Sequence, residues 1–263
     1  MENIVRELNR KVKGFKIGDV WTDWPRLVKN LSFAAFRRNV AGRRILGLER
    51  RGKNILFKLD KDKALLVHLK MSGRFLMNQK DKYTHLVFQF DRGKFLALSD
   101  MRKFARLALL ENKSLDSSPE LKNLGPDPFQ TDFAAFKRAF LNKKGRIKSL
   151  LLNQNMVSGI GNIYADETLW LARVHPLENA DLIGEDRWLR IYKAARKILK
   201  EAIRFKGTSI QTYRLPSGEK GGYQKVRRVY RRTGEPCFRC GTPIQRIKLS
   251  QRSTHFCPAC QSL

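Results

Sequence analysis

The sequence predicts an α+β protein of several domains, with a β-rich N-terminal half, a helical middle and a small C-terminal module. Three observations carry this prediction. Apolar and polar residues alternate with a period of two over residues 41–111, as in strands that bury one face. Beyond residue 129 the apolar spacing becomes helical. All four cysteines of the chain fall between Cys237 and Cys260.

The N-terminal domain, residues 1–122, is predicted to be an antiparallel β-sandwich with one flanking helix. Residues 1–13 place apolar side chains on one helical stripe, at Ile4, Val5, Leu8 and Val12. The alternating stretches are RRILGLERRGKNILFKL, KALLVHLKMSGRFLM, THLVFQF and KFLALSD, and the turn-like LDKDK and DRGK interrupt them. Such strands form an antiparallel layer, which we expect to fold into a sandwich.

A Pro- and Gly-rich segment, NLGPDPF at residues 123–129, is predicted to be an interdomain linker. After it come four helical stretches: FAAFKRAFLN, IKSLLLNQNM, IYADETLWLARV and DRWLRIYKAARKILKEAIRF. Residues 207–225 read as a flexible loop. We therefore assign residues 130–225 to a helical domain and residues 226–263 to the C-terminal module.

The cysteines form two CxxC knuckles, Cys237-Phe-Arg-Cys240 and Cys257-Pro-Ala-Cys260. Each knuckle points two thiolates at one metal ion, and the pair completes a tetrahedral shell with no open position. We predict one structural Zn²⁺, which also supplies folding energy to a module too small for its own core. A redox CxxC pair or unpaired thiols are disfavoured, because the chain has no other cysteine. We expect His255 to be a surface or DNA-facing residue, since four thiolates already fill the shell.

The chain is strongly basic: 54 Lys and Arg against 24 Asp and Glu give a formal net charge of +30. Such an excess favours a polyanionic partner, nucleic acid first, because Lys and Arg displace counterions from phosphates. Basic residues on the C-terminal module are expected to contact phosphates: Arg239, Arg246, Lys248 and Arg252. Charge alone leaves DNA and RNA open. A membrane is disfavoured, because no segment approaches the roughly 18 apolar residues of a spanning helix.

The N-terminal residues MENIVRELNRKVKGF are too charged for a secretory signal, and the clustered cysteines suggest reduced thiols. We therefore expect a cytoplasmic protein.

Several motifs resemble, in order, those of the formamidopyrimidine-DNA glycosylase family. ERRGKNILFKL resembles a strand with a phosphate-binding lysine, and HLKMSGRF and LSDMRKFARL resemble two void-filling loops. LLLNQNMVSGIGNIYADETLWLARVHPL resembles a helix–two-turn–helix, and VYRRTGEPCFRCGTPIQRIKLSQRSTHFCPACQ resembles the family's zinc finger. These matches cover nearly the whole chain. They imply a base-excision enzyme that extrudes a damaged nucleotide and fills the void it leaves.

The resemblance implies roles for six residues. Met71 would enter the base stack, Arg102 would donate hydrogen bonds to the orphaned base, and Phe104 would stack on a neighbouring base. This triad favours the oxidised-purine branch over the oxidised-pyrimidine branch. Without the resemblance, core packing would be the alternative for Met71 and Phe104. The residues implied to grip the phosphates flanking the extruded nucleotide are Lys53, Asn162 and Arg252.

The N-terminus departs from the family, whose members begin Pro-Glu-Leu-Pro-Glu after removal of the initiator Met. In the family the proline amine is the nucleophile and the following Glu is the acid/base. This chain begins MENIVREL, and Met1 falls where the family has Val. We hypothesise that a GTG valine codon was taken as the start; real loss of catalysis is the alternative.

With that segment missing, Lys53 is the catalytic position carried over, although an exposed lysine stays protonated, which disfavours a Schiff base. Glu167 in YADE is a further titratable candidate, with a helix-surface carboxylate as an equal interpretation.

Smaller departures also concern the expected site. Lys70 and Arg231 stand where the family usually has Gly and add charge near DNA, and Ala105 replaces a Gly whose φ could be positive. Residues 214–223, RLPSGEKGGY, resemble the segment that covers the extruded base. We expect this segment to be mobile.

The leading expectation is a bifunctional DNA glycosylase/AP lyase for oxidised purines, acting as a monomer on damaged double-stranded DNA in the bacterial nucleoid. A non-catalytic protein that binds lesions or abasic sites is the second interpretation. It predicts tight binding without strand cleavage. A zinc-ribbon module of transcription or translation is the third, and equal affinity for intact and abasic duplexes would favour it.

Overall fold

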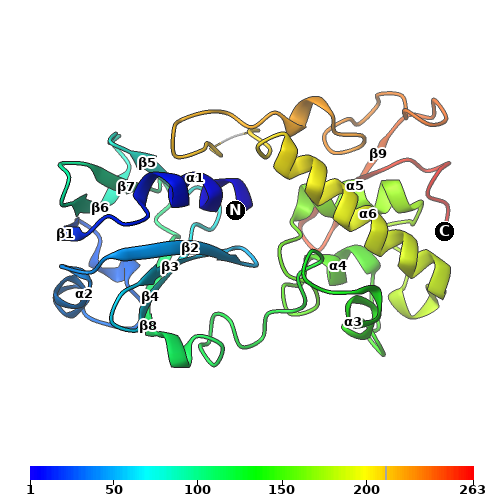
Figure 1. The fold of residues 1–263 in the computed structure, drawn as a ribbon. Coiled ribbons are helices and arrows are strands. Elements are labelled where there is room, and N and C mark those ends of the chain that lie inside the picture. The colour runs from blue at the N-terminus through cyan, green and yellow to red at the C-terminus, as the bar shows by residue number, and fades with distance from the viewer. Residues whose placement is uncertain (211) are drawn as a thin grey trace. The chain divides into compact units, whose positions relative to one another are not determined.

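The computed structural model describes residues 1–210 and 212–263, and the chain folds into two compact units (Figure 1). The first unit comprises Met1–Lys122 and Phe205–Gln224, and the second Asn123–Arg204 and Lys225–Leu263. The predicted α+β class is confirmed: the first unit is mainly strands and the second mainly helices. The predicted division at residues 122, 130 and 226 into three functional domains stays a prediction.

The first unit is a sandwich of two four-stranded antiparallel sheets, ordered β1-β6-β7-β5 and β2-β3-β4-β8. Its strands are β1 (Ile17–Thr22), β2 (Ile45–Arg51), β3 (Asn54–Leu59), β4 (Lys63–His68), β5 (Arg74–Met77), β6 (Thr84–Phe90), β7 (Phe95–Ser99) and β8 (Arg106–Glu111). Apolar faces of both sheets meet in one core. Phe57 of β3 packs against Phe75 of β5 at 5.8 Å and Phe88 of β6 at 6.5 Å, between ring centroids.

Helix α1 (Glu2–Val12) covers this sandwich as the apolar stripe predicts, because all four stripe residues are buried in the core. The side-chain oxygen of Asn9 accepts the backbone N–H of Leu48 at 2.8 Å and ties the helix to β2. Two elements lie outside the predicted pattern: strand β1 and helix α2 (Phe33–Val40). The α2 helix begins at Ser32, whose hydroxyl accepts the Ala35 N–H and so caps it.

Residues 205–224 belong in space with the sandwich, which differs from their predicted place in the helical domain. Leu215 is buried in the sandwich core. The N–H of Met77 at the end of β5 donates to the Pro216 carbonyl at 3.1 Å. Packing of Leu215 and Tyr213 against the core, together with the strand-edge hydrogen bond, therefore anchors a segment that composition marks as a loop.

The second unit is built on two packed helices, α5 (Asn162–Ala172) and α6 (Glu185–Arg204). The predicted helices near its start are shorter than their stretches, as α3 (Phe133–Arg138) and α4 (Ile147–Leu152). The C-terminal module contributes the hairpin of β9 (Gln245–Leu249) and β10 (Arg252–Phe256). The described residues also form short 3₁₀ helices at Pro25–Leu27, Asn112–Ser114, Ala180–Leu182 and Tyr223–Lys225.

The predicted linker, residues 123–129, is docked onto the second unit. Gly125 donates its N–H to the Gln154 carbonyl at 2.8 Å, and the Pro126 carbonyl accepts the Ser158 N–H. A Cβ on Gly125 would lie 2.5 Å from the Met156 carbonyl carbon, so glycine is required for this close approach. In the described part of the chain, no helix has the length and apolar character needed to cross a membrane.

Candidate nucleic-acid interface

A tight loop, residues 69–73, carries Met71 at the end of β4. Leu69 is buried, and its carbonyl accepts the Gly73 N–H at 3.0 Å. A Cβ on Gly73 would stand 2.4 Å from that carbonyl oxygen, so only glycine closes the turn. The Lys70 N–H donates to Nδ1 of His68 at 2.9 Å. The loop thus projects Met71, whose side chain is 70% exposed.

A second loop, residues 100–105 between β7 and β8, is organised by the fully buried Asp100. The Asp100 carboxylate accepts the backbone N–H groups of Phe104 at 2.7 Å, Ala105 at 2.8 Å and Arg102 at 3.3 Å. It also accepts the Ser72 hydroxyl, which belongs to the first loop. One carboxylate therefore holds the backbones of both loops in a fixed arrangement.

The structure brings the three predicted void-filling residues together on these two loops. Arg102 and Phe104 are exposed beside each other, with the guanidinium 4.5 Å from the ring centroid. Phe104 is 49% exposed, so neither it nor Met71 fits the core-packing alternative. Met101, 53% exposed on the same loop, is a further apolar side chain that the motif did not single out. The two loops form a wedge with apolar tips and a cationic flank.

Lys53 lies half-buried in the turn between β2 and β3, on the side of the sandwich that carries the wedge. Its charge acts on His68: burial first, then Lys70, Lys53 and Arg106, lower the pKa of His68 to about 4. His68 is therefore neutral at pH 7, which fits its role as acceptor for the Lys70 N–H. The surroundings of the wedge are therefore electropositive.

Backbone conformation separates the three glycine replacements. Lys70 and Arg231 adopt the left-handed region, with φ of 52° and 56°. A side chain in that region costs about 1–2 kcal/mol relative to the right-handed one. Ala105 is buried and is absent from the left-handed region, so the strain considered for it does not arise. The two strained replacements are both basic.

In the second unit, Asn162 and Arg252 are brought together by strand β10. Asn162 is the first residue of α5, and its Nδ2 donates to the Ser253 carbonyl at 3.0 Å. Arg252, the residue before Ser253 in β10, is exposed. Gly161 caps α5 without a side-chain acceptor, so the helix start keeps amide donors and the positive end of the dipole for an anion.

A buried polar network fixes β10 against α5. Lys148 is fully buried, its Nζ lies 2.6 Å from Oδ1 of Asp166, and it donates to the Thr254 hydroxyl at 2.7 Å. Oδ2 of Asp166 accepts the backbone N–H of His255 at 2.9 Å and faces its Nδ1 at 3.1 Å. The prediction of a surface position for His255 is wrong: it is 3% exposed, because it completes the solvation of Asp166.

Glu167 is also buried, which excludes the helix-surface interpretation. Its carboxylate accepts the consecutive backbone N–H groups of Arg228 at 2.8 Å, Val229 at 2.9 Å and Tyr230 at 3.0 Å. Burial raises the pKa of Glu167, and these N–H donors oppose the rise. Glu167 anchors the segment that enters the C-terminal module.

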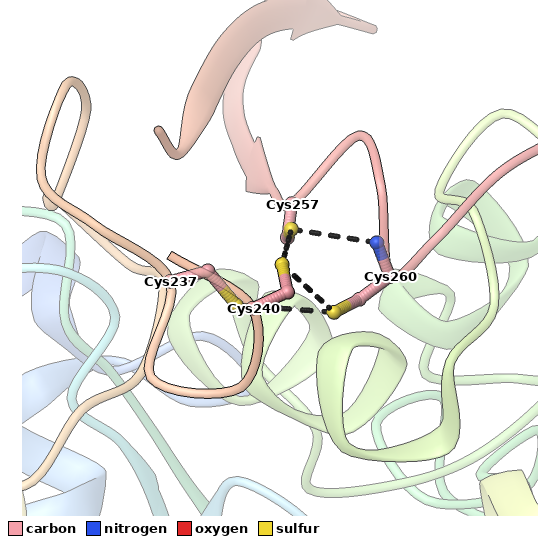
Figure 2. A group of neighbouring side chains, drawn as sticks. All are labelled: Cys237, Cys240, Cys257 and Cys260. Carbon is pink, nitrogen blue, oxygen red and sulfur yellow. Dashed lines mark hydrogen bonds between the residues drawn. The ribbon is translucent and has the colours of Figure 1, made fainter. Parts of the chain in front are cut away.

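The four cysteine sulfurs converge from the two CxxC turns, as Figure 2 shows. The Sγ–Sγ distances are 3.4 Å for Cys240–Cys260, 3.5 Å for Cys240–Cys257 and 3.9 Å for Cys237–Cys260. A zinc ion bound at about 2.3 Å to four sulfurs gives a tetrahedron with edges of about 3.8 Å. The observed set fits one structural zinc, so the predicted cofactor and its four ligands agree with the geometry.

The zinc module contacts α5 through Trp170, whose Nε1–H donates to Sγ of Cys237 at 3.4 Å. Arg239 stacks on the Trp170 ring at 4.0 Å and donates to the carbonyls of Trp170 and Leu171. The structure thus uses Arg239 to cap the end of α5, in place of the predicted phosphate contact. Arg246, Lys248 and Arg252 remain exposed on the hairpin.

The chain combines a sandwich that carries a projecting wedge, a helical unit and a four-thiolate zinc finger, and its net charge is +30. These features define a zinc-finger protein of the nucleic-acid-binding class. Family models identify three stretches: a formamidopyrimidine-DNA glycosylase N-terminal domain at residues 1–107, its H2TH domain at 124–214, and a zinc finger found in FPG and IleRS at 234–263. The chain belongs to the formamidopyrimidine-DNA glycosylase family.

Similar proteins match over the full length. A formamidopyrimidine-DNA glycosylase of Enterococcus faecalis is 39% identical, with 100% of this chain and 96% of the relative covered. One from Herpetosiphon aurantiacus is 38% identical, with 100% and 98% covered. The Lactococcus lactis Fpg solved with abasic-site DNA matches at a TM-score of 0.92 and 36% identity, and MutM solved with carbocyclic 8-oxo-G DNA at 0.92 and 35%, each covering 100% of this chain and 98% of the other.

Proposed function

We propose that this chain is a DNA glycosylase of base excision repair that removes oxidised purines such as 8-oxoguanine and formamidopyrimidines. The observation that carries the proposal is the exposed triad of Met71, Arg102 and Phe104 on two loops joined by one carboxylate. Exposed apolar tips are unfavourable in water, and a base stack is a partner that would bury them. Full-length similarity to enzymes named for this activity supports the same conclusion.

Lys53 in the first unit, and Asn162 with Arg252 in the second, would bind the phosphates that flank the extruded nucleotide. The hydrogen bond from Asn162 to Ser253 supports this pairing, because it keeps the α5 start beside the exposed arginine. One chain supplies every residue of this set, which favours action as a monomer on duplex DNA.

The chemical step would follow the family. A terminal proline amine attacks C1′ and displaces the base, giving an imine, and β,δ-elimination then cuts the strand. Lys53 is a phosphate ligand in this proposal.

Borohydride trapping on an 8-oxoguanine duplex tests the enzymatic proposal. Two proteins are compared: the chain as printed, and a chain in which Pro-Glu-Leu-Pro-Glu-Val replaces Met1. We expect the extended protein to form a covalent complex and to incise the lesion strand. Absence of both reactions overturns the glycosylase/lyase proposal. Tight binding to abasic-site DNA without incision by either protein would instead favour the non-catalytic, lesion-binding function.

A further inference from the structure

Four cations converge on a cavity beside the wedge, at a position outside the predicted phosphate ligands. The cavity has a volume of about 260 Å³ and is lined by Lys29, Lys70, Lys103, Phe104, Ala105 and Arg106. We call it the basic pocket. Lys70 precedes Met71 in one wedge loop, and Lys103 lies between Arg102 and Phe104 in the other. The pocket therefore adjoins the residues that would enter a base stack.

The charges of the basic pocket are not neutralised within the protein. Among the described residues, no carboxylate forms an ion pair with any of its four cations, whereas Lys58 and Lys63 on neighbouring strands each pair with a glutamate. The nearby Asp100 carboxylate is occupied by backbone N–H groups and the Ser72 hydroxyl. Burial and the charge of Arg106 lower the pKa of Lys70. This repulsion would be relieved by an anion.

The two lysines at the rim adopt a backbone conformation that disfavours side chains. Lys70 and Lys103 both have φ of 52°, in the left-handed region where glycine is unstrained. Each wedge loop thus carries a lysine at a position where glycine would be more stable. The two lysines therefore add charge beside the wedge at a cost in backbone strain.

We infer that the basic pocket binds one backbone phosphate of the DNA strand whose stack the wedge enters; this inference rests on the proposed function. Size favours a single phosphate group, since sites for whole small-molecule ligands measure roughly 300–1,000 Å³. Three lysines and an arginine supply the charge-assisted donors that phosphate oxygens accept. The pocket would act with Met71 and Phe104, setting how deeply the wedge enters.

Three glycine variants test the inference, and Lys61 supplies a matched control. Lys61 is an exposed lysine with φ of 51° in the turn before β4, at the opposite end of that strand from Lys70. Lys70→Gly, Lys103→Gly and Lys61→Gly therefore remove the same charge and relieve the same backbone strain. Each variant is expected to raise Tm, by about 2–4 °C for each kcal/mol gained. A rise in Tm shows that the variant is folded.

DNA affinity is measured by fluorescence anisotropy on an abasic-analogue duplex and an intact duplex, between about 50 and 200 mM KCl. Lys70→Gly and Lys103→Gly should lower the slope of log affinity against log salt by up to about 0.9. The double variant should lose no more than about 0.9, because both lysines bind one phosphate. Weakening should be equal on both duplexes, since phosphate contacts carry no base information. Lys61→Gly should keep the wild-type slope.

Slopes of Lys70→Gly and Lys103→Gly that match Lys61→Gly overturn the inference. A titration with inorganic phosphate at constant ionic strength distinguishes a site for free phosphate from a site for a DNA phosphate. If it raises the Tm of the wild type and not of Lys70→Gly, the pocket is a site for free phosphate and the DNA assignment fails. Failure of the proposed function has a different signature, namely that the wild type shows no preference for the abasic duplex. In that case the salt slopes on intact DNA still test whether the basic pocket binds a phosphate.

Discussion

At the scale of single residues, the interface depends on acceptors that the surface does not reveal. Asp100 is fully buried, yet it sets the backbone of both wedge loops through Phe104, Ala105 and Ser72. A carboxylate has two acceptor oxygens, whereas an amide of equal size has one acceptor oxygen and an N–H₂ group that only donates. The buried Asp100 carboxylate therefore fixes the loop backbones that expose Met71 and Phe104.

Replacement of Asp100 by Asn should unfold the protein more easily and also disorder the wedge. The new amide N–H₂ faces backbone donors, so at least one buried N–H loses its acceptor, which costs about 2–3 kcal/mol. Urea unfolding measures the loss of stability, and anisotropy measures the preference for abasic over intact DNA, which should fall. Asp91→Asn is the control, because exposed Asp91 accepts a single N–H, from Lys16. Wild-type stability for Asp100→Asn would refute this role.

His68 makes the stability of the first unit depend on pH. Its pKa is lowered to about 4, against 6.5 for a free imidazole, so the unfolded chain binds the proton more tightly. Between pH 6.5 and about 4 the unfolded state thus holds more protons, and stability falls as pH falls through this window. His68→Asn, whose side-chain oxygen can accept the Lys70 N–H, should remove this part of the pH dependence. Parallel Tm curves for variant and wild type across the window would contradict it.

At the scale of elements, local periodicity predicted the helix α1 and the presence of the strands, but not how the strands are buried. The α1 stripe is buried on one face. The strands β3, β4, β6 and β7 each bury four consecutive residues and therefore both faces. The packing of residues 205–210 and 212–224 was not predicted, because the side chains that pack, such as Tyr213 and Leu215, follow no regular spacing. The buried ion pair of Lys148 and Asp166 was not predicted either, because it joins distant elements and leaves no local sequence pattern. Motif resemblance supplied Met71, Arg102 and Phe104, while Asp100 required coordinates.

The hairpin of β9 and β10 should depend on zinc. Removal of the ion with a chelator leaves four thiolates within 4.8 Å of one another, and their repulsion or protonation opens the knuckles. Arg252 then loses its place beside Asn162, and DNA affinity should fall about tenfold or more as phosphate contacts are lost. Trp170 fluorescence should change in step, since its N–H contacts Cys237.

Zinc release is counted with a chromogenic chelator, and one ion per chain is expected. Restoring zinc should restore both the fluorescence and the affinity, which controls for oxidation of the thiols. Full affinity after complete release would show that the hairpin holds its shape without the metal.

At the scale of the whole molecule, the net charge of +30 opposes folding in the absence of a polyanion. The ion pairs found in the structure, such as Lys206–Glu219, sit mostly at the surface, where each contributes little. Cations such as those of the basic pocket have no acidic partner among the described residues. The same excess that recruits phosphate therefore acts as a destabilising term in the free protein.

Salt should consequently stabilise the free protein and weaken its complex with DNA. Raising KCl from about 10 to 150 mM shortens the Debye length from about 30 to 8 Å, so repulsion between distant cations is screened. Tm of the zinc-loaded protein should rise by several degrees, at about 2–4 °C per kcal/mol. Heparin, a polyanion without bases, should raise Tm at low salt and lose this effect at high salt. A neutral solute at matched osmolality is the control. A Tm that stays level or falls with salt would mean that local pairing, rather than net charge, governs the electrostatics of the free chain.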